Sequence, residues 1–241
     1  MKTNLRHKYV CMNFHICIKY LIMMLLPLLF ANCHKANEEP NWIEKFSNLT
    51  DEELEYARQN WLVAPMQYTN LNDHPSSYMN ANHVKPDTQH GVECAACSSA
   101  YLLRFYGETV DGVSLYHEST FPCKFEAGAY PKCFKIFFEK QLDNYKTEYY
   151  TGSTEDLKNA VSQGVPVIVL LVYEGTEMHY VPVVGYDDEY FYIQDSVEKY
   201  RNIADNDSCN ERIDMASFDA MWNLPFESCQ RLFVIVRNIA E

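Results

Sequence analysis

Residues 165–195 read VPVIVLLVYEGTEMHYVPVVGYDDEYFYIQD and contain three consecutive strand-like segments. These segments, residues 165–173, 179–186 and 190–194, are rich in the β-branched and aromatic side chains that favour strands. A fourth run of the same kind, residues 232–236 (LFVIV), follows near the end of the chain. Most of the helix-forming sequence comes earlier, and helices followed by strands are typical of α+β domains. We therefore predict an α+β fold with an antiparallel sheet.

Several segments predict helices. The longest is residues 94–106 (CAACSSAYLLRFY), an uninterrupted run followed by Gly107, a residue typical of helix C-caps. Further helices are predicted at about 50–62 after the capping pair Thr50 and Glu53, at 131–142 from Pro131, at 153–163 from the capping sequence Ser153–Asp156, and around 217–222. The helix over 94–106 is the one expected to pack on the sheet.

Composition and charge exclude several classes of protein. The 241 residues are 47% hydrophobic, which is too high a fraction for a disordered chain. The formal net charge is −13, and a chain this acidic offers little cationic surface for phosphate groups, so we expect no nucleic-acid partner. No sequence motif indicates a cofactor.

Residues 1–33 are predicted to form a signal peptide. They carry four basic residues and no acidic one, and the apolar run Leu21–Ala31 is too short to span a bilayer comfortably. Cys33 follows in a sequence that resembles a bacterial lipobox, which makes a lipid tether at Cys33 one option and an uncleaved signal anchor another. We expect an exported protein that is periplasmic, at the cell surface or extracellular.

The remainder of the chain divides into two parts. Residues 34–85 are predicted to be a linker with an N-terminal helical segment, and residues 86–241 to be the main domain. Without the leader, 16 basic side chains face 33 acidic ones, which gives the mature chain a net charge of −17.

Cys94 is the first candidate for chemistry, because it stands where a polar stretch gives way to the predicted helix over 94–106. The free N–H groups and the positive dipole end of a helix N-terminus favour a thiolate over a thiol. A nucleophilic thiolate also needs a base. An isolated cysteine would otherwise be a buried packing residue.

His179 and Asp195 are the candidates for that base and its orienting group. His179 begins one predicted strand and Asp195 follows the next, with Asp187 in the turn between them. A hairpin centred on Asp187 places the two residues opposite each other on one face, where Cβ atoms lie about 4.5–5.5 Å apart. A slip of one residue would put them on opposite faces. His90, close to Cys94 in sequence, is a weaker alternative base.

These residues resemble a known family. Gln89-x4-Cys94, followed by a helix ending in Leu102–Gly107 (LLRFYG), is similar to the nucleophile segment of papain-like cysteine peptidases of the bacteriocin-processing, or double-glycine, type. The resemblance continues through residues 164–169 (GVPVIV), 179–186 (HYVPVVGY), 192–196 (YIQDS) and the pair Phe218 and Trp222, and it covers about residues 86–225.

The resemblance implies a papain-like fold and a set of roles. Cys94 matches the nucleophile, His179 the base and Asp195 the residue that orients the histidine. Gln89 matches the glutamine whose side-chain amide, with the Cys94 backbone N–H, holds the oxyanion. We expect a stand-alone peptidase without a transporter domain, acting on a peptide or protein substrate.

The other cysteines have more than one interpretation. Cys94 and Cys97 form a C-x-x-C pair, which is also the pattern of redox sites, but Cys97 fits a buried packing thiol better. The export signal suggests two disulfides, Cys123–Cys133 and Cys209–Cys229. A structural zinc site is not expected, because these cysteines lack ligand spacing.

The predicted reaction is hydrolysis of a peptide bond through a thioester. Three alternatives remain at this stage. Acyl or amide transfer and cleavage of cell-wall peptides would use the same triad, and a catalytically silent binding module would use the fold alone.

Overall fold

The computed structural model describes residues 62–240 except 71, 81, 83, 119–120, 126–127, 143, 175–176, 205–207 and 225–228, together with Glu55 and Gln59. The predicted signal peptide over 1–33, Cys33 and most of the 34–85 segment, with nearly all of the predicted helix at 50–62, lie outside the described residues. In the described part of the chain, no helix has both the length and the apolar character needed to cross a bilayer.

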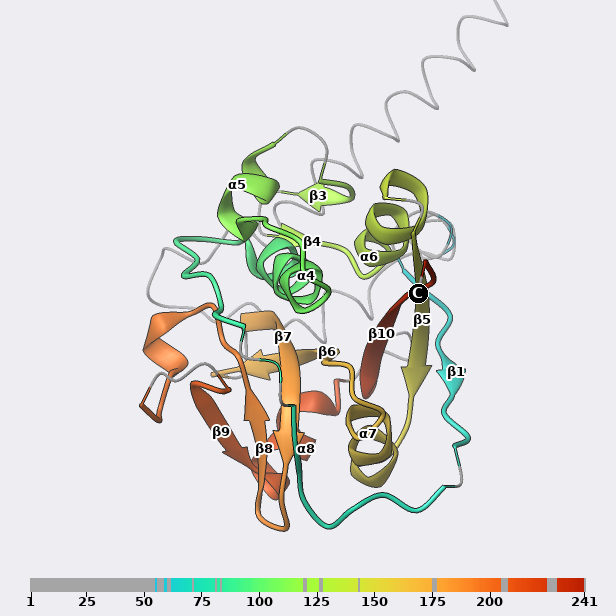
Figure 1. Ribbon diagram of the computed structural model, residues 1–241, viewed down its shortest axis with the longest axis vertical. Coiled ribbons are helices and arrows are strands. Elements are labelled where there is room, and N and C mark those ends of the chain that lie inside the picture. Colours follow the sequence, from blue (N-terminus) through green and yellow to red (C-terminus); the bar gives the residue numbers. More distant parts are fainter. Residues whose placement is uncertain are drawn as a thin grey trace, which may run out of the picture.

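An eight-stranded sheet forms the centre of the fold (Figure 1). Its order is β1 (Met66–Gln67), β5 (Tyr145–Thr151), β10 (Leu232–Asn238), β6 (Val167–Tyr173), β7 (Glu177–Tyr186), β8 (Tyr190–Ile193) and β9 (Glu211–Asp214), with β2 (Tyr78–Met79) paired to β7. Every pair is antiparallel except β1–β5. A small separate hairpin joins β3 (Lys124–Phe125) to β4 (Gly128–Ala129).

Helices pack against the sheet. They are α4 (Cys94–Phe105), α5 (Gly112–His117), α6 (Cys133–Lys135) with a π-helix (Ile136–Gln141), α7 (Thr154–Val161), the 3-10 helix η2 (Glu198–Tyr200) and α8 (Met215–Trp222). In Figure 1, α4, α5 and α6 gather in the upper half with the β3–β4 hairpin, and β7, β8 and β9 lie below them with α7 and α8. The α+β class is confirmed, although the sheet contains one parallel pair.

The predicted helices at 94–106, 131–142, 153–163 and 217–222 correspond to α4, to α6 with the π-helix, to α7 and to α8. The capping signal before α7 is present as a full capping box between Ser153 and Asp156. The four predicted strands are present as β6, β7, β8 and β10, whereas β5, β9 and α5 were not predicted.

Strand β6 explains why one stretch of sequence determines so much of the fold. Val167, Val169 and Leu171 belong to the core cluster on one face of the sheet, with α7 and α8. Ile168 and Leu170 belong to the cluster on the other face, with α4 and α6. Because the strand is buried on both faces, its sequence is a continuous apolar run rather than an alternating one.

Helix α4 is buried on nearly all sides. Its first ten residues, from Cys94 to Leu103, are all buried, which suits a sequence of small Ala, Ser and Cys side chains. Helix α5 crosses it so closely at Gly112 that an added Cβ atom would lie 2.5 Å from the Cys97 Cα atom. The same Gly112 N–H donates to the Asp87 carboxylate at 3.0 Å. Tight packing therefore fixes the N-terminal half of α4.

The turn between β7 and β8 differs from the prediction. Asp187 is its first residue rather than its centre, since the Asp187 N–H donates to the Tyr190 carbonyl at 3.0 Å. The Asp187 carboxylate accepts the N–H groups of Glu189 at 2.8 Å and of Tyr190 at 2.7 Å. The tip is therefore Asp188–Glu189, and the predicted direct pairing of His179 with Asp195 is wrong.

A β-bulge nevertheless brings these two residues together. Between Val183 and Gly185, β7 contains one residue more than the facing part of β8, so the register of the pair shifts by one residue. Past the bulge, Asp195 lies diagonally across from His179 on the same face. Because a one-residue shift exchanges the two faces, the register found at the turn would have placed them on opposite faces without the bulge.

Candidate active site

Cys94 is the first residue of α4, where the α-helical part of the fold meets β7. Its side chain is 7% exposed. The preceding residue, Glu93, makes no side-chain cap on the helix. The Glu93 carboxylate instead accepts the Gly91 N–H at 2.7 Å and lies 3.3 Å from His117 Nε2. The positive end of the helix dipole is therefore left to act on the Cys94 sulfur.

His179 and Asp195 form a buried pair. His179 Nε2 lies 2.9 Å from Asp195 Oδ1, within hydrogen-bond distance. The Val197 N–H also donates to Asp195 Oδ1, at 2.5 Å. Asn210 binds the Asp195 backbone from both sides, donating from Nδ2 to the carbonyl at 2.9 Å and accepting the N–H at 2.7 Å. Asp195 thus has a fixed position although it follows the end of β8.

The electrostatics of the pair favour a charged imidazole. Burial disfavours the charge, but the Asp195 carboxylate and the hydrogen bonds to Asp195 and Cys94 outweigh burial and raise the pKa of His179 to about 10. Burial likewise opposes ionisation of Asp195, yet its interaction with His179 and its hydrogen bonds hold the pKa of its carboxyl below the ordinary value. His179 therefore links the helix-terminal sulfur to a buried carboxylate.

Gln89 lies beside this pair and is bonded to the residue that follows Asp195. The Ser196 hydroxyl donates to Gln89 Oε1 at 2.6 Å, and the Gln89 N–H donates to the Ser196 carbonyl at 2.9 Å. Gln89 Nε2 donates to the Gly91 carbonyl at 2.7 Å. Because a primary amide carries two N–H groups, one remains for a further acceptor.

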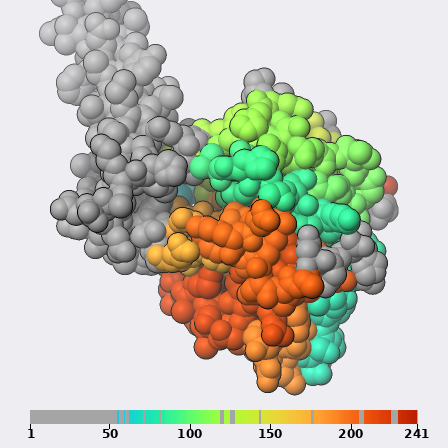
Figure 2. Space-filling model, turned by 90° about the vertical axis from the view of Figure 1, so that its left-hand side faces the viewer, coloured from blue at the N-terminus to red at the C-terminus, as the bar shows by residue number. Residues whose placement is uncertain are grey.

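The segment before Gln89 is held by two arginines. Arg104 of α4 donates to both Asp87 carboxylate oxygens at 3.1 Å. Arg201 donates to the Asp87 carbonyl at 3.1 Å and to the Asp195 carbonyl at 3.0 Å. In Figure 2 this teal segment forms a band between the green and the orange parts of the chain. It therefore joins the two parts of the molecule that carry Cys94 and His179.

The structure thus brings together all four residues singled out in the sequence, Cys94, His179, Asp195 and Gln89. Sequence reasoning did not identify Ser196, Arg201 or Glu211 as neighbours of the site. A period-two pattern could have indicated that Glu211 points inward, because residues of β9 alternate between buried and exposed and Glu211 is at a buried position.

The other histidines that the structure describes lie away from this arrangement or at its edge. His90, the alternative base, is exposed. His74 pairs with Glu155 at 3.0 Å, and His117 pairs with Glu93 and is 65% exposed. No group of three or more metal-ligating side chains gathers within the described residues.

Among the residues that the structure describes, both predicted disulfides are absent, since Cys123, Cys133, Cys209 and Cys229 form no disulfide bond. Cys209 belongs to a cluster with Val84, and Cys229 lies in the core cluster around Cys133. The pairing Cys209–Cys229 therefore joined residues from different parts of the core. Cys97 is buried as expected for a packing thiol, and burial raises its pKa far above the ordinary range.

Several solved structures are similar to this chain, and the one with a TM-score of 0.50 shows the same fold. The peptidase domain of Streptococcus ComA, a bifunctional ABC transporter involved in a quorum-sensing pathway, is 17% identical with a TM-score of 0.50, over 65% of this chain and 99% of that one. A Bacillus anthracis protein described as C39-like is 19% identical, with a TM-score of 0.48, over 68% of this chain and 100% of that one. A double-glycine motif protease from an AMS/PCAT transporter, solved with its leader peptide, is 18% identical, with a TM-score of 0.46, over 69% of this chain and 99% of that one.

No curated protein matches the chain in sequence. The profile of the peptidase C39-like family, however, matches residues 72–224, which is more than half of the chain and includes Gln89, Cys94, His179 and Asp195. The chain therefore belongs to the peptidase C39-like family and is a cysteine-type peptidase with a papain-like α+β fold.

Proposed function

We propose that this peptidase hydrolyses peptide bonds with a Cys94–His179–Asp195 triad and a thioester intermediate. The observation that carries the proposal is the buried His179 ring, which lies 2.9 Å from Asp195 Oδ1 through Nε2 and interacts electrostatically with the side chain of Cys94 at the start of α4. A nucleophile, a base and an orienting carboxylate in this sequence are the parts that acyl transfer requires.

In the first half of the reaction, the Cys94 thiolate attacks the carbonyl carbon of the scissile bond. The carbonyl oxygen becomes an oxyanion, and the free N–H of Gln89 Nε2 and the Cys94 backbone N–H are the proposed donors to it. The tetrahedral intermediate collapses, the C–N bond breaks, and protonated His179 gives its proton to the leaving amine. The product of this half is a thioester on Cys94.

In the second half, a water molecule attacks the thioester carbonyl. Neutral His179 accepts a proton from that water, and the same donors hold the second oxyanion. The C–S bond then breaks, the carboxyl product leaves, and the proton on His179 restores the thiolate–imidazolium pair. Asp195 remains ionised throughout and keeps the ring oriented.

The hydrogen bonds of Gln89 support its role as oxyanion donor. The Gly91 carbonyl can only accept, so it selects the orientation in which Nε2 faces the loop before Cys94 and Oε1 accepts from the Ser196 hydroxyl. Fixed donors are what an oxyanion hole needs, since they require no rearrangement when charge develops.

Alkylation with iodoacetamide tests the triad without a known substrate. We expect Cys94 to be labelled rapidly near neutral pH, and its labelling to slow by about tenfold or more in His179→Ala, because the imidazolium that favours the thiolate is lost. Mass spectrometry of the digested protein locates the label. Labelling of Cys94 that is slow in the native chain and unchanged in His179→Ala would contradict the triad.

The chain supplies two controls for this experiment. Cys123 is a partly exposed thiol, so its labelling serves as an internal reference that His179→Ala leaves unchanged. His90→Ala tests the alternative base. We expect no effect of His90→Ala on Cys94, because His90 is exposed and makes no contact in the His179–Asp195 pair.

Products distinguish hydrolysis from transfer. Incubation with a peptide library and a primary amine, followed by mass spectrometry, separates free carboxyl products from amide products. We expect carboxyl products alone. Products that carry the added amine would instead indicate acyl transfer, and release of cell-wall peptides from purified peptidoglycan would indicate an amidase.

We further propose that the protein is exported, on the basis of the basic and apolar leader over residues 1–33, with Cys33 as a lipid-attachment residue. Expression of the full chain in a bacterium, followed by fractionation and metabolic labelling with a fatty-acid analogue, tests this. Export with loss of the lipid label in Cys33→Ala is the expected result, and a full-length chain that stays in the cytoplasm would contradict export.

A further inference from the structure

Glu211 is a buried carboxyl group directly behind the triad. It is the first residue of β9 and is 3% exposed. Its neighbour Asn210 holds the Asp195 backbone through two hydrogen bonds of 2.7 and 2.9 Å. The start of β9 is thus fixed to Asp195, and the position of the Glu211 side chain relative to Asp195 follows from the sheet.

The carboxyl groups of Glu211 and Asp195 are neighbours in the buried site, because one tyrosine hydroxyl reaches both of them. Tyr173 lies beside both, since its hydroxyl donates to Glu211 Oε2 at 2.9 Å and lies 3.4 Å from Asp195 Oδ2. Two neighbouring carboxyl groups that are both buried do not both ionise, so one of them carries a proton and can donate it to the other. Asp195 already receives hydrogen bonds from His179 and the Val197 N–H, so the proton belongs to Glu211.

We propose that Glu211 is a positioning residue of this peptidase, kept as a neutral carboxylic acid whose O–H donates to Asp195 and fixes that carboxylate against His179. The proposal rests on the triad proposed above. Glu211 does not touch substrate in this arrangement; it acts through Asp195. Three donors, the His179 ring, the Val197 N–H and the Glu211 O–H, then surround one negative charge.

The surroundings of Glu211 agree with a neutral acid. Tyr173 from β6, His179 from β7 and Asp195 after β8 interact with it. The pocket that it lines also contains Glu174 from the β6–β7 turn, Lys199 and Tyr200 from η2, Tyr190 from β8, and Arg212 and Asp214 from β9, and Arg201 after η2 donates to the Asp195 carbonyl. The cations among them have other partners. Lys199 pairs with Glu177 at 3.1 Å and Glu174 at 3.8 Å, and Arg212 lies 4.7 Å from the Tyr190 ring.

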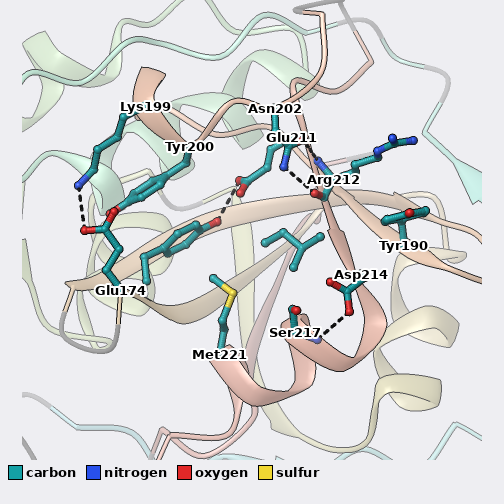
Figure 3. Close-up of a pocket in the computed structure, with 12 residues that line it drawn as sticks. Glu174, Tyr190, Lys199, Tyr200, Asn202, Glu211, Arg212, Asp214, Ser217 and Met221 are labelled. Atoms are coloured by element: carbon teal, nitrogen blue, oxygen red, sulfur yellow. Dashed lines mark hydrogen bonds and ion pairs between the residues drawn. The ribbon is translucent and has the colours of Figure 1, made fainter.

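Burial and the negative charge of Asp195 raise the pKa of Glu211 to about 9, which is consistent with the proposal. Glu211 also lines an open pocket of about 650 Å³, where Figure 3 shows it between Tyr200 and Arg212. This pocket gives Glu211 a route for proton exchange with solvent. Above pH 9, its ionisation would put a second negative charge beside Asp195 and remove the O–H that positions Asp195.

Infrared spectroscopy detects the proton on Glu211 directly. In the difference spectrum between the native chain and Glu211→Gln at neutral pH, we expect the carbonyl band of one protonated carboxylic acid. The band should disappear as the pH rises through about 9. Glu189→Gln is the matched control, because Glu189 is an exposed residue of the neighbouring turn and should give no such band. Absence of the band for Glu211 at neutral pH would overturn the proposal.

Alkylation of Cys94 then tests the effect on the triad. Glu211→Gln retains an N–H donor and should keep His179-dependent labelling within about threefold of the native chain, whereas Glu211→Leu has no donor and should lose about tenfold or more. Above pH 9, Glu211→Gln should keep its His179 dependence while the native chain loses part of it. Equal labelling of both variants with the native chain at every pH would show that Glu211 positions nothing.

The two experiments separate the inference from the function it rests on. If His179→Ala does not change Cys94 labelling, the triad itself is wrong, and the positioning role of Glu211 is overturned with it. If His179 matters and Glu211→Gln behaves as Glu211→Leu does, the triad stands and the donor role of Glu211 is wrong. If Glu211→Leu does not fold, the labelling of Glu211→Gln and the infrared band still test the donor role of Glu211.

Discussion

Asp195→Asn tests the electrostatics at the centre of this site. The substitution keeps the shape of the side chain and an oxygen that accepts from His179 Nε2, and it removes one buried negative charge. In the native chain, burial disfavours the His179 charge, and Asp195 is the main reason that the pKa of His179 is nevertheless raised to about 10. Without the carboxylate, burial should take that pKa to its ordinary value of about 6.5 or below.

The size of the effect on the ionisation of His179 follows from the difference between these two pKa values. At about 1.4 kcal/mol for each pH unit, the native environment favours the imidazolium by about 5 kcal/mol relative to an imidazole in water. At pH 8, about 99% of His179 is charged when its pKa is near 10, and about 3% or less when it is 6.5 or lower. Asp195→Asn should therefore reduce the charged fraction at pH 8 by about thirtyfold.

The raised pKa of His179 should also make the stability of the folded chain depend on pH. A histidine whose pKa is raised in the folded state contributes stability in full below about pH 6.5, and the contribution is lost as the pH rises through about 10. The difference in Tm between the native chain and Asp195→Asn should therefore be largest at about pH 6.5 and below, should shrink as the pH rises from about 6.5 to about 10, and should be lost above that.

NMR titration of the His179 ring measures the charge directly, with the signal assigned by its loss in His179→Ala. The expected midpoint is near pH 10 in the native chain and at or below 6.5 in Asp195→Asn. Asp188→Asn, an exposed residue of the β7–β8 turn, is the matched control and should leave the midpoint in place. A midpoint in Asp195→Asn within one unit of the native value would refute the reasoning.

Three further predictions follow from other contacts. Glu211→Gln should raise Tm by an amount that grows from pH 4.5 to 9, because the native glutamate must stay protonated to fold; a gain independent of pH in thermal melts would contradict this. Gly112→Ala should lower the free energy of unfolding by about 1–3 kcal/mol in urea titrations, since its Cβ atom would meet the α4 backbone at 2.5 Å, and an unchanged midpoint would count against that packing. Trp222→Phe should cost about 1–3 kcal/mol by the same measurement, because the Leu232 carbonyl loses the indole N–H at 2.8 Å; a loss below 0.5 kcal/mol would show that water replaces it.

Local sequence signals were sufficient for much of the fold. The apolar run of β6, the capping box of α7 and Gly107 after α4 each depend on a few neighbouring residues, so their sequence patterns predicted the elements correctly. Strand β5 was not predicted, because its sequence (YKTEYYT) has polar residues on one face. It forms a strand because it pairs with β10. Its pattern is a weak signal without that partner.

The cysteines also show the difference between what the sequence predicts and what the packing of elements decides. The export signal suggested the pair Cys209–Cys229, but such a signal says nothing about which core cluster each residue joins. A disulfide needs two Cα atoms within about 7 Å, and that distance is set by the packing of whole elements.

The sequence by itself determined the α+β class, the helix beginning at Cys94 and the set of four residues from which the candidate site is built. Only the tertiary structure decided how they meet: the bulge at Val183–Gly185 places Asp195 on the face of His179, and β9 brings Glu211 behind it. The physical reason is that helix caps and hydrophobic periodicity act over a few residues. Strand register and the neighbours of a buried carboxyl group depend on contacts between residues far apart in the chain.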